Sequence, residues 1–215
     1  VYDSNKIVWY ENDGSENFTQ NIIANDYGAQ IAVADLDEDG DYDVIGADYT
    51  NGHINWYENN GSENFTKNTI DNSDMTNAWD IKVGDVDGDG DLDVVGMAST
   101  NNSTADDKIV LYINNGSEAF TEFVVDDDLN RPYKFRMTDI DNDGDLDMMV
   151  GSRDEDKVIW YENVDGGYIL GLSLSGTPSG AETVTVSPAS SAIFDVAGNA
   201  ASTSQSNNTG TLNDQ

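Results

Sequence analysis

Short runs in which hydrophobic and polar residues alternate extend along most of the chain. In one run Ala32 separates Ile31 from Val33, and the same spacing returns as Ile-Lys-Val at 81–83 and as Phe-Arg-Met at 135–137. A period of two is typical of a β-strand that buries one face, so Ile31, Val33 and their equivalents are expected to face a core. Clusters of Gly, Asn and Asp bound the runs, and no helical period competes. The pattern predicts an all-β chain.

A longer pattern repeats the strands in a fixed order. The motif Ile-Val-Trp-Tyr-Glu-Asn at residues 7–12 returns with changes at 54–59, 109–114 and 158–163. A Gly-Ser-Glu-x-Phe-Thr segment follows the first three copies, and an Asp-rich loop precedes the last three. A repeat of about 50 residues that contains four short strands is typical of a β-propeller blade.

The repeats predict about three and a half four-stranded propeller blades. We expect a half blade at 1–25 and complete blades at about 29–70, 78–125 and 133–166. Closed propellers contain roughly four to eight complete blades, so the open ends are expected to be completed by neighbouring copies or by the rest of a longer chain. A start at Val1, without Met or a leader, also suggests a segment of something longer.

Residues 167–215 differ in composition from residues 1–166. Ser, Thr, Gly, Ala and Asn dominate, and charge is almost absent. Runs at 170–175, 182–187 and 192–196 predict strands separated by Pro and Gly turns. These runs resemble the closing strands of bacterial immunoglobulin-like domains. The resemblance implies a partial Ig-like β-sandwich segment that ends in a polar tail.

The charge of the chain excludes several classes of partner. Asp and Glu number 42 against 9 Lys and Arg, which gives a formal net charge of -33. A surface this acidic repels the phosphates of nucleic acid and of anionic membranes. The hydrophobic content of 37% can build a core but not a membrane span. No cysteine is present, so disulfide frameworks and thiolate chemistry are excluded.

Three Asp-rich loops carry the candidate chemistry, and each has the pattern D-x-D-x-D-G-D-x-D. Their aspartates are Asp35, Asp37, Asp39, Asp41 and Asp43 in the first loop, Asp85, Asp87, Asp89, Asp91 and Asp93 in the second, and Asp139, Asp141, Asp143, Asp145 and Asp147 in the third. Calcium takes six to eight oxygen ligands at about 2.3–2.6 Å, and alternating carboxylates on a curled loop supply several of them. We therefore expect three Ca²⁺ sites. Magnesium is less suitable, because it prefers fewer protein ligands and retains its waters.

The loop pattern also predicts a role for each position. By analogy with calcium loops of the helix-loop-helix type, positions one, three and five coordinate through side chains, position seven through its backbone carbonyl, and position nine closes the site. The Gly at position six permits the sharp turn. The alternative is a merely solvated acidic turn, because runs of charge usually are solvated. Five carboxylates within nine residues repel one another, however, and this cost, met three times, favours a bound cation.

The three loops, with the Val-Ile-Gly, Val-Val-Gly and Met-Met-Val-Gly segments that follow them, resemble the VCBS/FG-GAP repeats of calcium-binding β-propellers. That group includes the integrin α-chain head, and the resemblance covers residues 1–166. It implies that each loop joins the first two strands of a blade and binds calcium with the ligand roles given above. It also implies a secreted, extracellular or cell-surface protein.

These features predict a non-enzymatic structural or adhesive module whose blade loops are made rigid by calcium. Its partners would be further copies of itself or other parts of a larger chain, and serial association of this kind would build a fibre. A propeller that binds glycans or surface proteins is the alternative, and a polysaccharide lyase or hydrolase is a more distant one. His53 is the only histidine, and no nucleophile motif accompanies it.

Recurring aromatic residues bear on the glycan-binding alternative. They occupy one strand region in successive repeats and are Trp9, Trp56 and Trp160 together with Tyr10, Tyr57, Tyr112 and Tyr161. Aromatic faces can stack on sugars, but one such residue per blade at a fixed position is also what packing between blades demands. Packing is the preferred interpretation.

Overall fold

The structure of the protein is a computed structural model. It describes residues 5–26, 28, 30–72, 75–100, 107–153, 157–164, 168–174, 183–185 and 209–211. Within these ranges every regular element is a β-strand, which confirms the all-β prediction. The same ranges hold no helical segment with the length and hydropathy that crossing a membrane demands.

The described strands form four successive sheets and a final short pair. The half blade consists of β1 (Ile7–Asn12) and β2 (Phe18–Ala24). Blade 1 consists of β3 (Gln30–Ala34), β4 (Asp43–Asp48), β5 (His53–Asn59) and β6 (Phe65–Asp71). Blade 2 consists of β7 (Ala78–Gly84), β8 (Asp93–Ala98), β9 (Lys108–Asn114) and β10 (Phe120–Asp126). Blade 3 consists of β11 (Pro132–Thr138), β12 (Asp147–Ser152), β13 (Lys157–Val164) and β14 (Tyr168–Leu174), and the short pair is β15 (Thr183–Thr185) with β16 (Thr209–Thr211).

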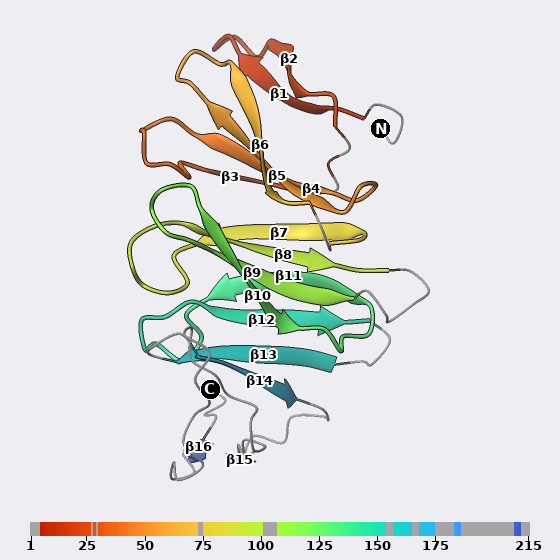
Figure 1. Ribbon diagram of the computed structural model, residues 1–215, viewed down its shortest axis with the longest axis vertical. Coiled ribbons are helices and arrows are strands. Elements are labelled where there is room, and N and C mark those ends of the chain that lie inside the picture. The colour runs from red at the N-terminus through yellow and green to blue at the C-terminus, as the bar shows by residue number, and fades with distance from the viewer. Residues whose placement is uncertain are drawn as a thin grey trace.

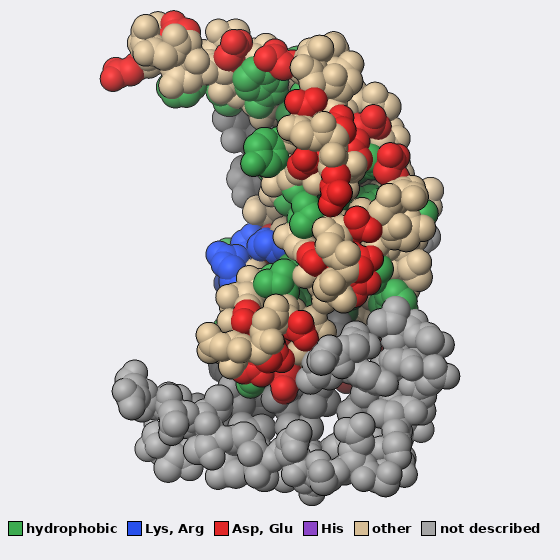
Figure 2. Space-filling model, turned by 90° about the vertical axis from the view of Figure 1, so that its left-hand side faces the viewer, with side chains coloured by type: hydrophobic (Ala, Val, Ile, Leu, Met, Phe, Trp, Pro, Cys, Tyr) green, Lys and Arg blue, Asp and Glu red, His purple; other side chains and the backbone are tan. Residues whose placement is uncertain are grey.

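Each blade is an antiparallel meander whose strands follow one another in chain order. The sheets stack in the order of the sequence, from the half blade at one end toward blade 3 near the other (Figure 1). The stack curves, so one side of the molecule is hollowed (Figure 2). The aspartate loops join β3 to β4, β7 to β8 and β11 to β12, which are the first two strands of each blade. The described sheets thus form a series of propeller-type blades that does not close into a ring.

The end of the third blade was predicted too early. The sequence placed it at residue 166, whereas β14 pairs with β13 along its whole length, from Val164↔Tyr168 to Val158↔Leu174. The sequence becomes uncharged before blade 3 ends. A strand can pair through its backbone whatever the charge of its side chains, so the change in composition does not mark the end of the blade. Apart from β15 and β16, residues 175–215 lie outside the described residues, and the Ig-like prediction for them lies outside as well.

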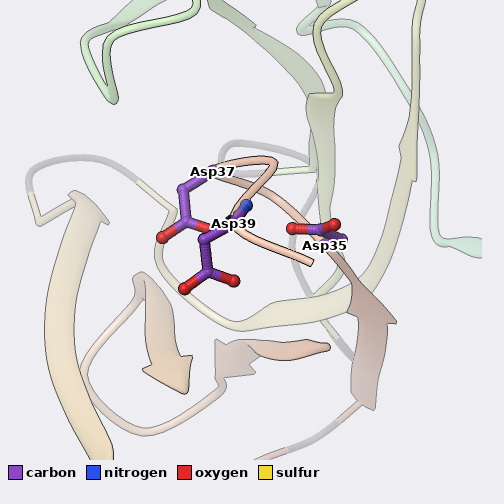
Figure 3. Close-up of side chains that lie close together, drawn as sticks. All are labelled: Asp35, Asp37 and Asp39. Atoms are coloured by element: carbon purple, nitrogen blue, oxygen red, sulfur yellow. Dashed lines mark hydrogen bonds between the residues drawn. The ribbon is translucent and has the colours of Figure 1, made fainter. Parts of the chain in front are cut away.

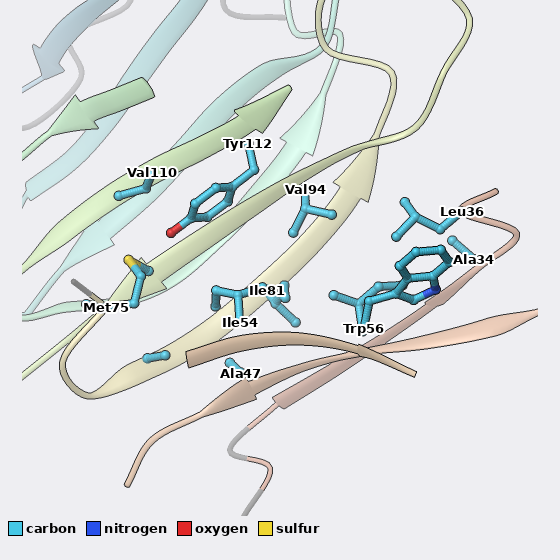
Figure 4. Packing of buried hydrophobic residues seen from close by; sticks show 13 residues of the cluster. Ala34, Leu36, Ala47, Ile54, Trp56, Met75, Ile81, Val94, Val110 and Tyr112 are labelled. Atoms are coloured by element: carbon cyan, nitrogen blue, oxygen red, sulfur yellow. The ribbon is translucent and has the colours of Figure 1, made fainter. Parts of the chain in front are cut away.

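The hydrophobic core lies between consecutive blades. Ile54 and Trp56 of blade 1 pack in one cluster with Ile81, Val94 and Tyr112 of blade 2, and none of these five side chains is more than 2% exposed (Figure 4). A second cluster joins blade 2 to blade 3 in the same way. Burying one such side chain contributes roughly 1.5–3 kcal/mol. The burial of Trp56 confirms the packing interpretation for this residue.

A hydrogen bond between a tyrosine and an aspartate recurs at each junction between blades. The hydroxyl of Tyr57 donates to Asp26 at 2.7 Å, that of Tyr112 donates to Asp71 at 2.7 Å, and that of Tyr161 donates to Asp126 at 2.6 Å. Each tyrosine comes from the third strand of one blade, and each aspartate ends, or lies just beyond, the last strand of the preceding unit. Hydrogen bonds to a charged acceptor are stronger than neutral ones, so these pairs fix the stacking of the blades.

The buried face predicted for the first strand of blade 1 is wrong. Ile31 and Val33 are 49% and 59% exposed, whereas Ile81 and Phe135, at the position of Ile31 in blades 2 and 3, are 1% and 0% exposed. Those two residues pack against the preceding blade. The unit that precedes blade 1 has two described strands, equivalent to the third and fourth of a blade. Nothing among the described residues therefore covers Ile31 and Val33.

Candidate metal centre

The backbone of each aspartate loop turns at two positions. The Gly at position six is left-handed in all three loops, with φ of 95° at Gly40, 102° at Gly90 and 107° at Gly144, which confirms the role predicted for it. Position four is left-handed as well, with φ of 60°, 76° and 65°. The residues at position four are Glu38, Gly88 and Asn142. A left-handed conformation costs a residue such as Glu about 1–2 kcal/mol, so the loop maintains this turn against a penalty in its first copy.

The carboxylates at positions one, three and five bind the loop's own backbone N–H groups. The N–H of Gly40 donates to Asp35 at 3.1 Å, and the equivalent distances in the second and third loops are 3.1 and 3.2 Å. The position-five N–H donates to position three at 3.3 Å in each loop. The position-seven N–H donates to position five at 2.9, 2.9 and 3.0 Å. These bonds curl the three loops in nearly the same way and hold their carboxylates on one side of the turn.

Each loop gathers carboxylate oxygens at one point. In the first loop one oxygen from each of Asp35, Asp37 and Asp39 lies within 4.8 Å of the others (Figure 3). In the second loop the grouped residues are Asp85, Asp87 and Asp93, and in the third they are Asp139, Asp141 and Asp147. Oxygens on opposite sides of a calcium ion lie roughly 5 Å apart, so these separations suit a common cation. A donor set made of oxygens alone favours calcium over the metals that prefer nitrogen or sulfur.

Position nine has a structural role that the sequence does not reveal. Asp43, Asp93 and Asp147 are each 0% exposed. One carboxylate oxygen accepts the N–H of position two, at 3.2, 2.8 and 3.0 Å in the three loops. The other oxygen accepts the N–H of an asparagine on the third strand of the blade, at 2.7, 2.8 and 2.8 Å. Position nine therefore fastens the loop to its sheet, and each oxygen retains a lone pair for a cation.

In the first two loops the side chain at position seven lies against another part of the blade. A methyl group built on Gly61 would overlap the carboxylate of Asp41, and one built on Gly116 would overlap that of Asp91. Both glycines lie in the turn after the third strand, the Gly-Ser-Glu-x-Phe-Thr segment of the sequence, and both are left-handed, with φ of 71° and 70°. The left-handed φ favours a glycine there, and the contact leaves no room for a methyl group at Gly61 or Gly116. The expectation that position seven coordinates through its backbone carbonyl stays a prediction.

Burial and mutual repulsion disturb the protonation of the loop carboxylates. Burial, aided by the charge of the next aspartate in the loop, raises the pKa of Asp37, Asp87 and Asp141. Burial also raises the pKa of Asp43, and it raises the pKa of Asp93 to about 6. Loss of water and nearby like charge both disfavour the ionised form. A divalent cation among these groups would remove both penalties.

Two glutamates near the loops were missed by sequence reasoning. Tyr161 pairs with Met148, so Glu162 comes next to the start of the third loop's closing strand. Burial, and then the charges of Asp141, Asp147 and Asp143, raise the pKa of Glu162. The charge of Glu58, at the same place in blade 1, contributes to the raised pKa of Asp37. The signal was the Glu of the Trp-Tyr-Glu-Asn motif, which blade 2 replaces by Ile113, so the first and third loops have one more nearby carboxylate than the second.

The face of the molecule that carries the loops is strongly acidic. Figure 2 shows Asp and Glu side chains gathered along this face, with Lys and Arg side chains gathered at one place on the hollowed side. His53, the remaining candidate from the sequence, opens β5 opposite Asp48 and lies in the third strand of blade 1 rather than in an aspartate loop.

Comparison with known proteins supports the repeat assignment. An FG-GAP-like repeat family matches residues 35–96, which extend from the first aspartate loop into β8. No curated protein sequence matches the chain. Four chains of solved structures match it, among them a lectin of Agrocybe aegerita whose structure is described as showing specific recognition of non-reducing terminal N-acetylglucosamine.

The likeness to the lectin is one of fold. The TM-score is 0.52 at 19% sequence identity, over 80% of this chain and 47% of the lectin chain. The present chain thus spans about half the length of that structure. Together with the match at residues 35–96, the likeness identifies the fold as a β-rich arrangement that contains an FG-GAP-like repeat.

Proposed function

We propose that this protein is a non-enzymatic, calcium-binding module of an extracellular or cell-surface protein, in which three Ca²⁺ ions make the blade loops rigid. One observation carries the proposal. Three loops of identical pattern adopt nearly the same hydrogen-bonded turn, and each brings carboxylate oxygens within 4.8 Å of one another. In every loop the carboxylates at positions one and three would bind the ion. Position five joins them in the first loop, and position nine joins them in the second and third.

The energetic role of calcium follows from the charge of the loops. Without a cation, five carboxylates in nine residues repel one another and several are partly buried, which raises their pKa values. Calcium present at about one hundred times its dissociation constant would stabilise each site by roughly 2.7 kcal/mol. Three such contributions are comparable to the net stability of a whole domain, about 5–15 kcal/mol.

Calorimetric titration of calcium into chelator-treated protein tests the proposal. We expect three ions per chain. Asp87→Ala should reduce the number to two, because Asp87 belongs to the oxygen cluster of the second loop. Asp127→Ala removes the same charge from an exposed residue outside the loops and should leave three sites. Absence of calcium binding, or equal effects of the two substitutions, would contradict the proposal.

We also propose that neighbouring copies complete the half blade. Ile31 and Val33 are left uncovered at this end, and Tyr10, the counterpart of the bridging tyrosines, is 56% exposed. A two-stranded unit that paired with β1 would cover Ile31 and Val33, and the blade to which that unit belongs would supply the surface next to Tyr10, so that the stack continues, as in strand addition. Light scattering in calcium should therefore detect assemblies that Val33→Lys abolishes and Val124→Lys, on the exposed part of β10, does not. A chain that is monomeric at every calcium concentration would contradict completion by copies.

Carbohydrate binding is a second candidate function, favoured by the likeness to a lectin. Trp56, one of the recurring aromatic residues, is 2% exposed and has no free face for a sugar. Tyr133 is 54% exposed and is a better probe. Saturable binding on a glycan array that Tyr133→Ala removes would support this candidate, and a negative array would retire it.

A further inference from the structure

A surface cavity of about 450 Å³, broadly open to solvent, lies on blade 3 beside the first residues of β11, whereas the third aspartate loop follows the last residue of that strand. The described residues that line it are Tyr133, Lys134, Gly151, Ser152 and Arg153. Ligand sites commonly have volumes of roughly 300–1,000 Å³. The strand runs for seven residues before the loop begins, so about 20 Å separates the cavity from the candidate calcium site.

A β-bulge presents the aromatic ring of this cavity. Pro132 pairs with Ser152 and Lys134 with Gly151, which leaves Tyr133 as the extra residue between them. Bulges of this kind redirect a side chain and occur often beside binding sites. The backbone of Tyr133 is held in place by the indole N–H of Trp79, which donates to the Tyr133 carbonyl at 3.1 Å. The ring itself remains 54% exposed.

The cavity is cationic in a chain that is otherwise strongly acidic. The guanidinium of Arg153 lies 5.9 Å from the centre of the Tyr133 ring. Lys134 is the residue after Tyr133 in the sequence. Lys82 on β7, Arg131 just before β11 and Arg136 within β11 also belong to this region. With Lys134 and Arg153 they make up five of the nine Lys and Arg residues of the chain. Buried Asp80 pairs with Lys82 at 2.7 Å and with Lys134 at 3.3 Å. Asp107, also buried, accepts the backbone N–H of Arg131 at 2.7 Å. Two carboxylates beside five cations leave an excess of positive charge among the described residues of this region.

Blade 2 has different residues at the equivalent positions. The pair Lys134↔Gly151 of blade 3 corresponds to Asp80↔Met97 of blade 2. Met97 is 0% exposed and packs in the cluster that joins blade 2 to blade 3. At Gly151 an added methyl group would have its nearest neighbour at 3.9 Å, so the floor of the cavity is open. Three differences, Met to Gly, Asp to Lys and Ser99 to Arg153, thus convert a packed junction into an open cationic cavity.

From these features we infer that the cavity binds a sugar that carries a carboxylate, such as a uronic acid residue of a polysaccharide. Arg153 and Lys134 would bind the carboxylate, the guanidinium through paired hydrogen bonds. The exposed face of Tyr133 would stack on the sugar ring. The Ser152 hydroxyl donates to the Asn130 carbonyl and keeps a lone pair for a sugar hydroxyl. The inference rests on the second candidate function and names the ligand class for it.

The test is a calorimetric titration, in calcium, of a glucuronic-acid-containing oligosaccharide and of its carboxyl-reduced neutral counterpart. We expect the acidic sugar to bind at least tenfold more tightly than the neutral one, and salt to weaken the binding. Arg153→Gln and Tyr133→Ala should each weaken it tenfold or more, whereas Lys6→Gln, which removes an exposed cation at the other end of the stack, should not. Calcium stoichiometry, measured on the same variants, should stay unchanged and shows that they are folded.

Three outcomes would overturn the inference. The first is failure of the acidic sugar to bind. The second is equal binding of the two sugars without salt dependence, which would leave carbohydrate binding standing and remove only the acidic specificity. The third is a change in sedimentation of Arg153→Gln without any sugar effect, which would make the cavity a contact between copies of the chain.

Discussion

At the residue scale, position nine connects the candidate metal sites to the fold. Each carboxylate oxygen of Asp43, Asp93 and Asp147 accepts a hydrogen bond from a backbone N–H. One N–H belongs to the loop and the other to the third strand of the same blade. A cation that any of them bound would act on the loop and on the sheet together. The three aspartate loops are in this sense joints of the blades as well as binding sites.

The protonation of these carboxylates predicts an inverted pH dependence for the calcium-free protein. Asp93 has a folded pKa of about 6, above the value near 3.9 expected when it is unfolded, so the folded state takes up protons first as pH falls. In chelator, the melting temperature should therefore rise as pH falls from 7 toward 5. In saturating calcium it should fall over the same interval, because protons displace the ion. A chelated protein that loses stability between pH 7 and 5 would contradict this account.

The glycine after the third strand offers a matched pair of substitutions. Gly116→Ala would place a methyl group on the Asp91 carboxylate in a left-handed turn, whereas Gly14→Ala meets nothing within 4 Å at φ 78°. Both should lose about 1 kcal/mol for the backbone conformation. Only Gly116→Ala should also weaken calcium binding at the second loop, which titration calorimetry can measure. Equal effects of the two on calcium would show that Asp91 and the turn are independent.

At the element scale, the blades are joined by apolar packing, by one tyrosine hydroxyl per junction and by further hydrogen bonds, such as the one from the Asn163 side chain to the Val86 carbonyl at 2.7 Å. The sequence predicts the repeat, the strand order and the aspartate loops, because each has a recurring chemical signature. It predicts a strand at 170–175 but assigns it to the next unit and not to blade 3, because the residues of β14 lack the motif of the other fourth strands. It also does not predict the left-handed position four: Gly88 and Asn142 are residue types that tolerate this conformation, but Glu38 is not, so the three copies give no common signal. The exposure of Ile31 depends on strands outside its own blade, which a local alternation cannot report.

Removal of one bridging hydroxyl should loosen the stack. Tyr112→Phe leaves the Asp71 carboxylate, which is 6% exposed, without that partner, and the expected loss is about 1–3 kcal/mol in the free energy of unfolding. Tyr10→Phe makes the same chemical change at a tyrosine that is 56% exposed and bonded to Gln20 within its own hairpin, and it should be close to neutral. Urea denaturation in calcium measures both. A neutral Tyr112→Phe would mean that the tyrosine hydroxyl does not help to order the blades.

At the scale of the whole molecule, a net charge of -33 is organised rather than dispersed. Acidic side chains follow the face that carries the aspartate loops, and cations gather on the hollowed side (Figure 2). A stack of sheets with this much like charge resists compaction through self-repulsion. Three divalent ions would cancel six charges at the points where the repulsion is most concentrated, so calcium is the condition under which we expect the stack to be stable.

The stabilising role of calcium is tested most directly by the melting temperature. It should be measured in excess chelator and again in calcium at about one hundred times its dissociation constant. Three sites worth roughly 2.7 kcal/mol each should raise the midpoint by about 15–30 °C in a protein of this size. The Asp87→Ala variant should lose about a third of that increase, and Asp127→Ala none of it. Equal melting temperatures with and without calcium would contradict the account.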